Sequence, residues 1–315
     1  GVSLLLGEAA DGFEQTDDGL VVRLKSGQEL PAQFVALGIG VRPENKLAVD
    51  AGLEVGPRGG IQVNDHLQTS DPDIYAVGDA IEVKDFVLGV PTQVPLAGPA
   101  NRQGRIAADN IFGRSSRYRG TQGTAILGLF DLTAAMTGAS EKVLKRGEIP
   151  HRMVYVHPSN HAGYYPGAEQ MTLKVLFDPE SGKVLGAQGV GGSGVDKRID
   201  VLAVAIQTGM TVFDLEEMEL AYAPQFGSAK DPINMVGFVA AGLLRDDHPQ
   251  IDVATLMETP LDERPFLLDV RTAAEFVAGH LPGAVNIPVD DLRSRLGELP
   301  DNQDIAAYCK VGQRG

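Results

Sequence analysis

The order of apolar and polar positions in the first part of the chain predicts short strands followed by one long helix. Three apolar runs have the length of strands and stand next to turn residues: 21–24, 34–37 and 74–77. A helix is predicted over residues 96–112, because Pro99 stands in its first turn and Gly113 just after its end.

The pattern changes near residue 121. Residues 173–177 and 183–188 flank a turn and predict an antiparallel hairpin. Residues 196–208 predict an amphipathic helix. Its apolar stripe comprises Ile199, Leu202, Ala203 and Ile206. The segment 213–218 is acidic and is predicted as a turn, so no strand is expected after this helix.

The C-terminal part has the order of an α/β domain. Residues 245–250 are polar, contain a proline and predict a linker. A buried strand is expected at 266–270, a short helix at 272–278, and another strand at 304–308 that leads directly to Cys309.

Composition and charge restrict the possible functions. The 315 residues are 43% hydrophobic and 22% charged, as in ordinary globular proteins. A formal net charge of −15 argues against nucleic acid or a membrane surface as partner, because both are polyanionic. The single cysteine, Cys309, excludes an internal disulfide and fits a reducing, cytoplasmic setting. The longest apolar stretch, 236–244, is too short to span a bilayer.

Both ends of the sequence indicate a piece of a longer protein. The chain opens at Gly1 without a methionine and stops at Gly315, directly after a loop that carries glycine and arginine. We therefore expect some of the functional residues to lie outside it.

The segment TSDPDIYAVGDA, residues 69–80, places the Asp79 carboxylate at the carboxyl end of a predicted strand, the edge where open α/β sheets bind ligands. Gly78 permits close approach of the backbone. A helix that starts at Leu96 and Ala97 would direct its positive N-terminus at an electron-rich ring. The alternative is that Asp79 only caps a turn.

This segment resembles the second FAD-binding motif of the pyridine nucleotide–disulfide oxidoreductases, and PLAGPANRQGR, residues 95–105, resembles the helix that follows it there. The resemblance covers about residues 1–244. It implies FAD as cofactor and NADH or NADPH as co-substrate. It also implies that Asp79 holds the ribityl chain, next to Gly78, and that Leu96 and Ala97 face the isoalloxazine.

A second glycine pattern, GVGGSG at residues 189–194, satisfies the dinucleotide fingerprint, with Asp214 downstream. We reject a nucleotide role, because the preceding strand is the second arm of a predicted hairpin and not part of a parallel βαβ unit. The match is instead to the interface domain of the same family, where this loop is structural.

Two further segments resemble the coenzyme A-disulfide reductase branch. In NHAGYYPGA, residues 160–168, the resemblance implies substrate contacts from His161, Tyr164 and Tyr165. In residues 221–234 it implies that Tyr222 reaches the partner subunit's active site and can donate a proton or a hydrogen bond beside the reactive sulfur. A plain surface loop and a packed interface aromatic remain the alternatives.

Asn101 and Arg105 lie one helical turn apart, and we expect them to meet the polar chain of the substrate. A solvated helix face is the alternative. The family also includes NADH oxidases and peroxidases. Both branches need a nucleophilic cysteine near an N-terminal FAD motif. This sequence contains neither that cysteine nor that motif.

The last segments resemble a rhodanese domain: LDVR at 268–271, GHLPGAVNIP at 279–288 and CKVGQR at 309–314. A loop of small and polar residues after a strand turns backbone N–H groups inward, which lowers a thiol pKa and stabilises a persulfide. Cys309 is therefore the predicted catalytic residue, with Lys310 and Arg314 orienting an anionic sulfur donor. A buried structural cysteine is the alternative. His280 is interpreted as a structural hydrogen bonder.

The predicted fold class is α/β and α+β, with remnants of doubly wound FAD- and NAD(P)-binding domains. The expected boundaries are 1–45 for the end of the NAD(P)H-binding domain, 46–118 for the second FAD-binding segment, 119–245 for an α+β dimerisation domain, 246–254 for a linker and 255–315 for a truncated rhodanese-like domain.

The predicted function is that of an FAD-dependent NAD(P)H oxidoreductase that reduces coenzyme A disulfide or persulfide, coupled to a rhodanese sulfurtransferase module. We expect a cytoplasmic homodimer that acts on a small thiol, disulfide or persulfide, with no metal, nucleic acid or membrane. The alternatives are an NADH oxidase or peroxidase, and a sulfurtransferase or sulfur carrier with a non-catalytic flavin-type scaffold.

Overall fold

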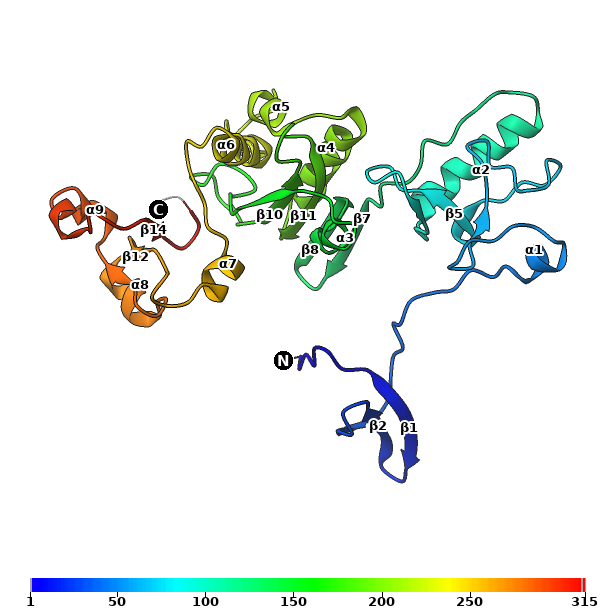
Figure 1. The fold of residues 1–315 in the computed structure, drawn as a ribbon, viewed down its shortest axis with the longest axis horizontal. Helices are drawn as coiled ribbons and strands as arrows, with labels where there is room; N and C mark the ends of the chain where they lie inside the picture. The colour runs from blue at the N-terminus through cyan, green and yellow to red at the C-terminus, as the bar shows by residue number, and fades with distance from the viewer. Residues whose placement is uncertain (1, 313, 315) are drawn as a thin grey trace. The chain divides into compact units, whose positions relative to one another are not determined.

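The computed structural model describes residues 2–312 and 314, and it divides into two compact units, 1–44 and 45–315 (Figure 1). The first unit is a three-stranded antiparallel sheet in the order β1-β2-β3. Its strands are β1 (Ala10–Thr16), β2 (Gly19–Leu24) and β3 (Glu29–Ala32). Strand β2 confirms the prediction at 21–24.

Two predicted strands are wrong. Residues 34–37 have no strand partner in the described part of the chain, and Phe34 is 80% exposed. Of residues 74–77, only Tyr75 pairs, through an isolated bridge to Gln68. An apolar run becomes a strand only when a neighbouring strand satisfies its backbone groups, and neither segment has such a neighbour here.

The second unit begins with a small mixed sheet in the order β4-β5-β6. Its elements are α1 (Lys46–Asp50), β4 (Ile61–Gln62), the 3₁₀ turn η1 (Gly78–Ala80), β5 (Ile81–Lys84), β6 (Pro91–Thr92) and α2 (Ala97–Ile111). Helix α2 confirms the prediction within one residue at each end. Its buried face, with Ile106 and Ala107, packs in one cluster with Leu67, Ile81 and Val83.

A five-stranded antiparallel sheet in the order β7-β8-β11-β10-β9 forms the middle of the chain. Its strands are β7 (Ala125–Leu129), β8 (Leu132–Gly138), β9 (Arg152–Val156), β10 (Thr172–Phe177) and β11 (Val184–Gly191), and its helices are α3 (Glu141–Arg146), α4 (Val195–Thr208), α5 (Val212–Glu217) and α6 (Pro232–Leu244). The predicted β10–β11 hairpin and helix α4 are confirmed.

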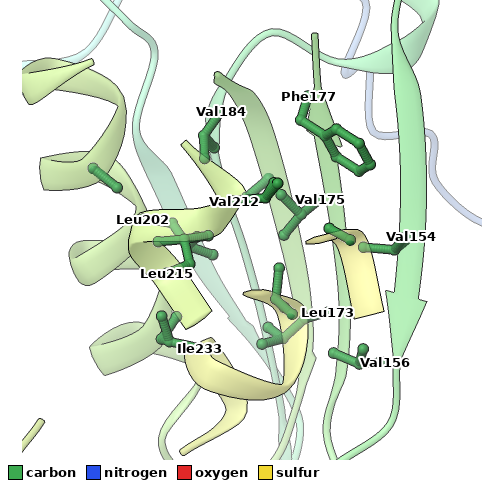
Figure 2. Close-up of a cluster of buried hydrophobic side chains, with 14 of the residues drawn as sticks. Val154, Val156, Leu173, Val175, Phe177, Val184, Leu202, Val212, Leu215 and Ile233 are labelled. Carbon is green, nitrogen blue, oxygen red and sulfur yellow. The ribbon is translucent and has the colours of Figure 1, made fainter. Parts of the chain in front are cut away.

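Helices α4, α5 and α6 bury one face of this sheet. Figure 2 shows Leu173 and Val175 from β10 directed at Leu202 of α4, Leu215 of α5 and Ile233 of α6, and all five are fully buried. Alternate residues of a strand point to the same face, so β10 supplies the sheet side of this core.

Residues 213–217 are helical, which corrects the turn predicted over 213–218. Thr211 and Asp214 form a reciprocal capping box at the start of α5: the Asp214 carboxylate accepts from the Thr211 N–H, and the Thr211 hydroxyl accepts from the Asp214 N–H. The GVGGSG segment begins inside β11, which pairs antiparallel on both sides. No parallel βαβ unit is present there, as predicted.

A parallel sheet in the order β13-β12-β14 completes the described chain. The elements are α7 (Val253–Glu258), β12 (Phe266–Asp269), α8 (Ala273–Ala278), β13 (Val285–Asn286), α9 (Val289–Leu292), the 3₁₀ turn η2 (Leu296–Glu298) and β14 (Ile305–Tyr308). The mixed α/β and α+β class is thus confirmed. Across the described residues, no helix combines the length and apolarity needed to cross a bilayer.

Candidate functional site

The first candidate site is the contact between η1 and the start of α2. The Gly78 N–H donates to Gln103 Oε1 at 2.7 Å, and Gln103 is buried on α2. Gly78 has a φ of +81°, and a Cβ placed there would lie 4.0 Å from the Ala100 side chain. The turn that carries Asp79 is therefore fixed against the first turns of α2.

The N-terminus of α2 offers unsatisfied backbone N–H groups. Leu96 is its N-cap in extended conformation and supplies no side-chain hydrogen bond, and Ala97 is exposed. Asp79 is exposed as well. A carboxylate that accepts hydrogen bonds thus stands beside a helix end that attracts electron density. These two features match the needs of a polyol chain and of a reduced flavin ring.

The two predicted substrate residues of α2 are exposed. Asn101 and Arg105 share one face, and Arg105 forms an i,i+4 ion pair with Asp109 at 3.6 Å. Sequence reasoning missed Gln103, which links η1 to the helix. Its only signal in the sequence was a polar residue on the same helix face as Pro99 and Ile106.

The second candidate site brings the two predicted tyrosines together. The hydroxyl groups of Tyr164 and Tyr222 lie 3.2 Å apart, although they come from separate loops. His161 stacks edge-on against Tyr165, with ring centroids 5.9 Å apart, and its Nε2 lies 3.3 Å from the Pro166 carbonyl. All four side chains lie on one short surface loop or directly against it.

The hydroxyl of Tyr164 keeps its proton. The hydrogen bond with Tyr222, and secondly burial, raise the pKa of Tyr164 above the ordinary tyrosine value. Tyr164 therefore stays protonated through neutral pH and can donate a hydrogen bond to a sulfur or thiolate placed beside its ring.

A buried ion pair, Arg198–Asp231, holds both tyrosine loops in place. Arg198 is 1% exposed and Asp231 3% exposed, and the Arg198 Nη2 lies 2.7 Å from Asp231 Oδ2. The same Nη2 donates to the Asn160 carbonyl at 3.0 Å, next to His161. The loops also bond directly, from Ala162 N–H to the Gly227 carbonyl at 2.9 Å.

Asp231 has a second role as the N-cap of α6. Its carboxylate accepts from the Ile233 N–H at 3.1 Å, while Asn234 Oδ1 accepts from the Asp231 N–H at 3.0 Å. Sequence reasoning missed this pair. The signal for Asp231 was present, because an aspartate directly before Pro232 is typical of a helix start.

The third candidate site surrounds Cys309, which follows β14 directly. Its Sγ accepts hydrogen bonds from the Gly312 N–H at 3.2 Å and from the Arg314 N–H at 3.3 Å. Backbone N–H groups that converge on a sulfur favour its anionic form. Gln313, which belongs to the same motif, lies outside the described residues.

The loop is tied to α8 by a bidentate ion pair. The Arg314 guanidinium donates to Glu275 at 2.9 and 2.8 Å. These bonds, and then the Thr272 backbone N–H, hold the pKa of Glu275 well below its usual range. The Glu275 carboxylate, together with Cys309, raises the pKa of Arg314. Glu275 was missed by sequence reasoning, although Thr-x-x-Glu is a capping-box signature.

A buried network supports the strand before the cysteine. Burial by itself would raise the pKa of Asp269, but hydrogen bonds from the Arg271 side chain and backbone lower it below its usual range. Arg271 also donates to the Gly279 carbonyl at 2.7 Å, and its guanidinium lies 5.7 Å from the centre of the Tyr308 ring. The end of β12, the turn after α8 and the end of β14 are thereby joined.

The remaining predicted residues of this site lie at its edge. Lys310 is exposed beside Cys309. His280 Nδ1 lies 2.9 Å from the Phe276 carbonyl, and its ring stacks on Phe276 at 3.7 Å. His280 is thus held by local structural contacts, in agreement with its interpretation as a structural residue.

Comparison with known families accounts for these three regions. The model for pyridine nucleotide-disulphide oxidoreductase matches residues 1–104, and the model for the dimerisation domain of the same proteins matches residues 124–231. The chain belongs to this family. A rhodanese-like domain matches residues 252–315, so both resemblances drawn from the sequence are confirmed.

Among the relatives of this chain, coenzyme A disulfide reductase of Staphylococcus haemolyticus is 37% identical over 224 residues, which are 71% of this chain and 50% of that protein. The crystal structure of reduced Bacillus anthracis CoADR-RHD is 48% identical, with a TM-score of 0.91, over 98% of this chain and 55% of that one. A NAD-dependent persulfide reductase from A. fulgidus is 36% identical, with a TM-score of 0.89, over 98% and 56%. The chain spans about half the length of these relatives.

Removing the buried carboxylate is expected to leave Arg198 charged and unpaired. Asp231→Ala should lower the free energy of unfolding by about 3–5 kcal/mol in urea titrations. Thr211→Ala, which removes only the N-cap of α5, should cost about 1 kcal/mol and serves as the matched control. Equal losses in the two variants would show that the ion pair adds nothing beyond capping.

The tyrosine contact predicts a shift in phenol titration. In Tyr222→Phe, the pKa of Tyr164 should fall back toward its ordinary value, because the hydrogen bond that raises it is lost. The control Tyr165→Phe, which removes a neighbouring hydroxyl outside the pair, should leave it unchanged. NMR titration of the Tyr164 ring measures both, and an unaltered curve in Tyr222→Phe would contradict the contact.

The Arg314–Glu275 pair predicts the reactivity of Cys309. Glu275→Gln keeps an acceptor for the helix cap but removes the charge that holds Arg314. The loop N–H groups should then converge less well on the Cys309 sulfur, so alkylation of Cys309 at neutral pH should slow by about three- to tenfold. Glu298→Gln breaks a similar bidentate pair with Arg295 away from the cysteine and should leave the alkylation rate unchanged. Identical rates in all three proteins would refute the role of the pair.

The same pair has a defined pH dependence. Because the folded-state pKa of Glu275 lies below that of the unfolded chain, the pair stabilises the fold fully above the ordinary glutamate range. That stability is lost as the pH falls through the lowered folded-state value, and is constant toward alkaline pH.

Proposed function

We propose that the intact protein is an FAD-dependent NAD(P)H oxidoreductase that reduces coenzyme A disulfide or persulfide. NAD(P)H and a proton would convert a disulfide into two thiols, or a persulfide into a thiol and hydrogen sulfide. The contact between the Tyr164 and Tyr222 hydroxyls carries the proposal, because it unites the two segments that resemble this branch of the family.

FAD, when bound, supplies an acceptor for hydride from NAD(P)H and a donor of electrons to a cysteine expected outside this chain. The residues of η1 and α2 fit this cofactor. We propose that Asp79 accepts hydrogen bonds from the ribityl hydroxyls beside Gly78, and that the N–H groups at Leu96 and Ala97 face the ring. The exposed carboxylate and the uncapped helix start support this assignment.

The substrate is proposed to lie between α2 of one subunit and the tyrosine loops of its partner. Asn101 and Arg105 would contact its polar chain, and His161, Tyr164 and Tyr165 would line the opposite side. Tyr222 would donate a proton to the departing thiolate. A homodimer is also supported by the β7–β8 hairpin, where Leu127 and Phe130 are 57% and 95% exposed.

The rhodanese-like domain is proposed to carry sulfane sulfur as a persulfide on Cys309. The two N–H groups at its Sγ would stabilise the terminal anion, and Lys310 and Arg314 would attract an anionic sulfur donor. Its product, a protein-bound persulfide, is of the class that the flavin-linked site reduces. We also propose a cytoplasmic location. The proposed domain boundaries are 1–45, 46–118, 119–245, 246–254 and 255–315.

The intact polypeptide should purify yellow and oxidise NADH faster when coenzyme A disulfide or persulfide is present. Asp79→Ala should weaken FAD binding by about tenfold or more, because a charged hydrogen-bond acceptor is lost. Asp73→Ala, an exposed carboxylate in the same motif, is the matched control and should bind FAD normally. Flavin absorbance and NADH consumption measure these outcomes.

Three results would favour other functions. A polypeptide without flavin absorbance, even when supplied with FAD, would contradict the reductase. Rapid oxygen consumption without stimulation by the sulfur substrates would indicate an NADH oxidase. Thiosulfate-to-cyanide turnover by a colourless protein would indicate a sulfurtransferase on a non-catalytic scaffold.

A further inference from the structure

A cavity of about 340 Å³ lies beside α2 and is lined mainly by this helix and by the loop of residues 117–124. The charged side chains that line it are those of Arg102, Arg105, Arg117 and Arg119. Among the described residues that line it, none is acidic. Four arginines and no acidic side chain in one lining are unusual in a chain whose net charge is −15, and they favour an anionic ligand.

Three of these arginines have no ion-pair partner in the described part of the chain. Arg105 pairs with Asp109 at 3.6 Å, and Arg114 takes the other oxygen of the same carboxylate at 3.1 Å. Arg102, Arg117 and Arg119, by contrast, form no ion pair with any described residue. Their charges are therefore available to a ligand.

The loop that carries Arg117 and Arg119 is held rigidly. Tyr118, between them, is buried, its N–H donates to the Asp65 carbonyl at 2.8 Å, and its hydroxyl bonds to Thr121. Gly120 has a φ of +102°, and a Cβ there would lie 2.5 Å from a backbone oxygen of Lys84. A loop fixed before binding loses little entropy when it receives a ligand.

An unpartnered buried acceptor belongs to the same cavity. Gln122 is 8% exposed, and its Nε2 donates to Thr137 Oγ1 at 2.6 Å and to the Ala203 carbonyl at 3.1 Å. These two bonds fix the amide, and its Oε1 has no hydrogen-bond partner among the described residues. A buried acceptor of this kind calls for a hydroxyl or amino donor. Phe86 adds an aromatic surface to the lining.

We propose that this cavity binds a nucleoside diphosphate. The diphosphate would pair with the arginine side chains, which match phosphate oxygens in bidentate geometry. A sugar hydroxyl or a base amino group would donate to Gln122 Oε1, and the base would lie against Phe86. The volume falls in the range of small-molecule sites, about 300–1,000 Å³. The proposal goes beyond the reductase activity and requires neither bound flavin nor sulfur chemistry.

Calorimetric titration of the 315-residue chain with ADP tests the site. ADP should bind saturably, and the double variant Arg117→Gln/Arg119→Gln should bind it at least about tenfold more weakly. Arg114→Gln is the matched control, since Arg114 is an exposed arginine on the same segment that does not line the cavity. It should change the affinity by less than about twofold if only local contacts matter.

A second variant separates the two halves of the ligand. Gln122→Leu should lower the affinity for ADP but leave the affinity for inorganic pyrophosphate unchanged. Retained binding of pyrophosphate would also show that the variant is folded. Coenzyme A, added as a competitor, distinguishes a free nucleotide from the nucleotide end of a larger molecule. Absence of saturable ADP binding at low ionic strength, or an equal loss in Arg114→Gln, would overturn the proposal.

Discussion

The buried ion pair between Arg198 and Asp231 is the interaction on which the arrangement of the middle domain depends. It connects the start of α4, the start of α6 and the backbone at Asn160 within one set of hydrogen bonds. Two charges removed from water repay their desolvation only when nearly all their donors and acceptors are satisfied, which is the case here. The pair therefore acts less as a source of stability than as a constraint on loop position.

Each candidate site follows the same principle. In each, reactive or ligand-binding groups lie on a loop, and a charged or polar side chain ties that loop to a helix: Gln103 at η1, Arg198 at the tyrosine loops and Glu275 at the cysteine loop. Loops alone would sample many conformations. Fixing them to helices supplies the preorganised geometry that chemistry at sulfur requires.

Local signals made much of the fold predictable, and non-local contacts account for what was missed. Helix α2 and the β10–β11 hairpin were predicted because proline, glycine and turn residues mark their ends. The strand predicted at residues 34–37 was wrong, because a strand also needs a neighbour. The site motifs were recognisable separately, but the Tyr164–Tyr222 and Glu275–Arg314 contacts join segments 58 and 39 residues apart. The roles assigned to the site residues remain predictions.

The carboxylate of Glu275 serves two structures at once, since it accepts from the Thr272 N–H at the start of α8 and from the Arg314 guanidinium. Glutamine is interchangeable with glutamate at this position of an isolated helix cap. It is not interchangeable here, because the second bond needs a negative charge. A substitution at Glu275 that leaves helix α8 unchanged therefore alters the surroundings of the Cys309 sulfur. We expect α8 and the cysteine loop to change together in evolution.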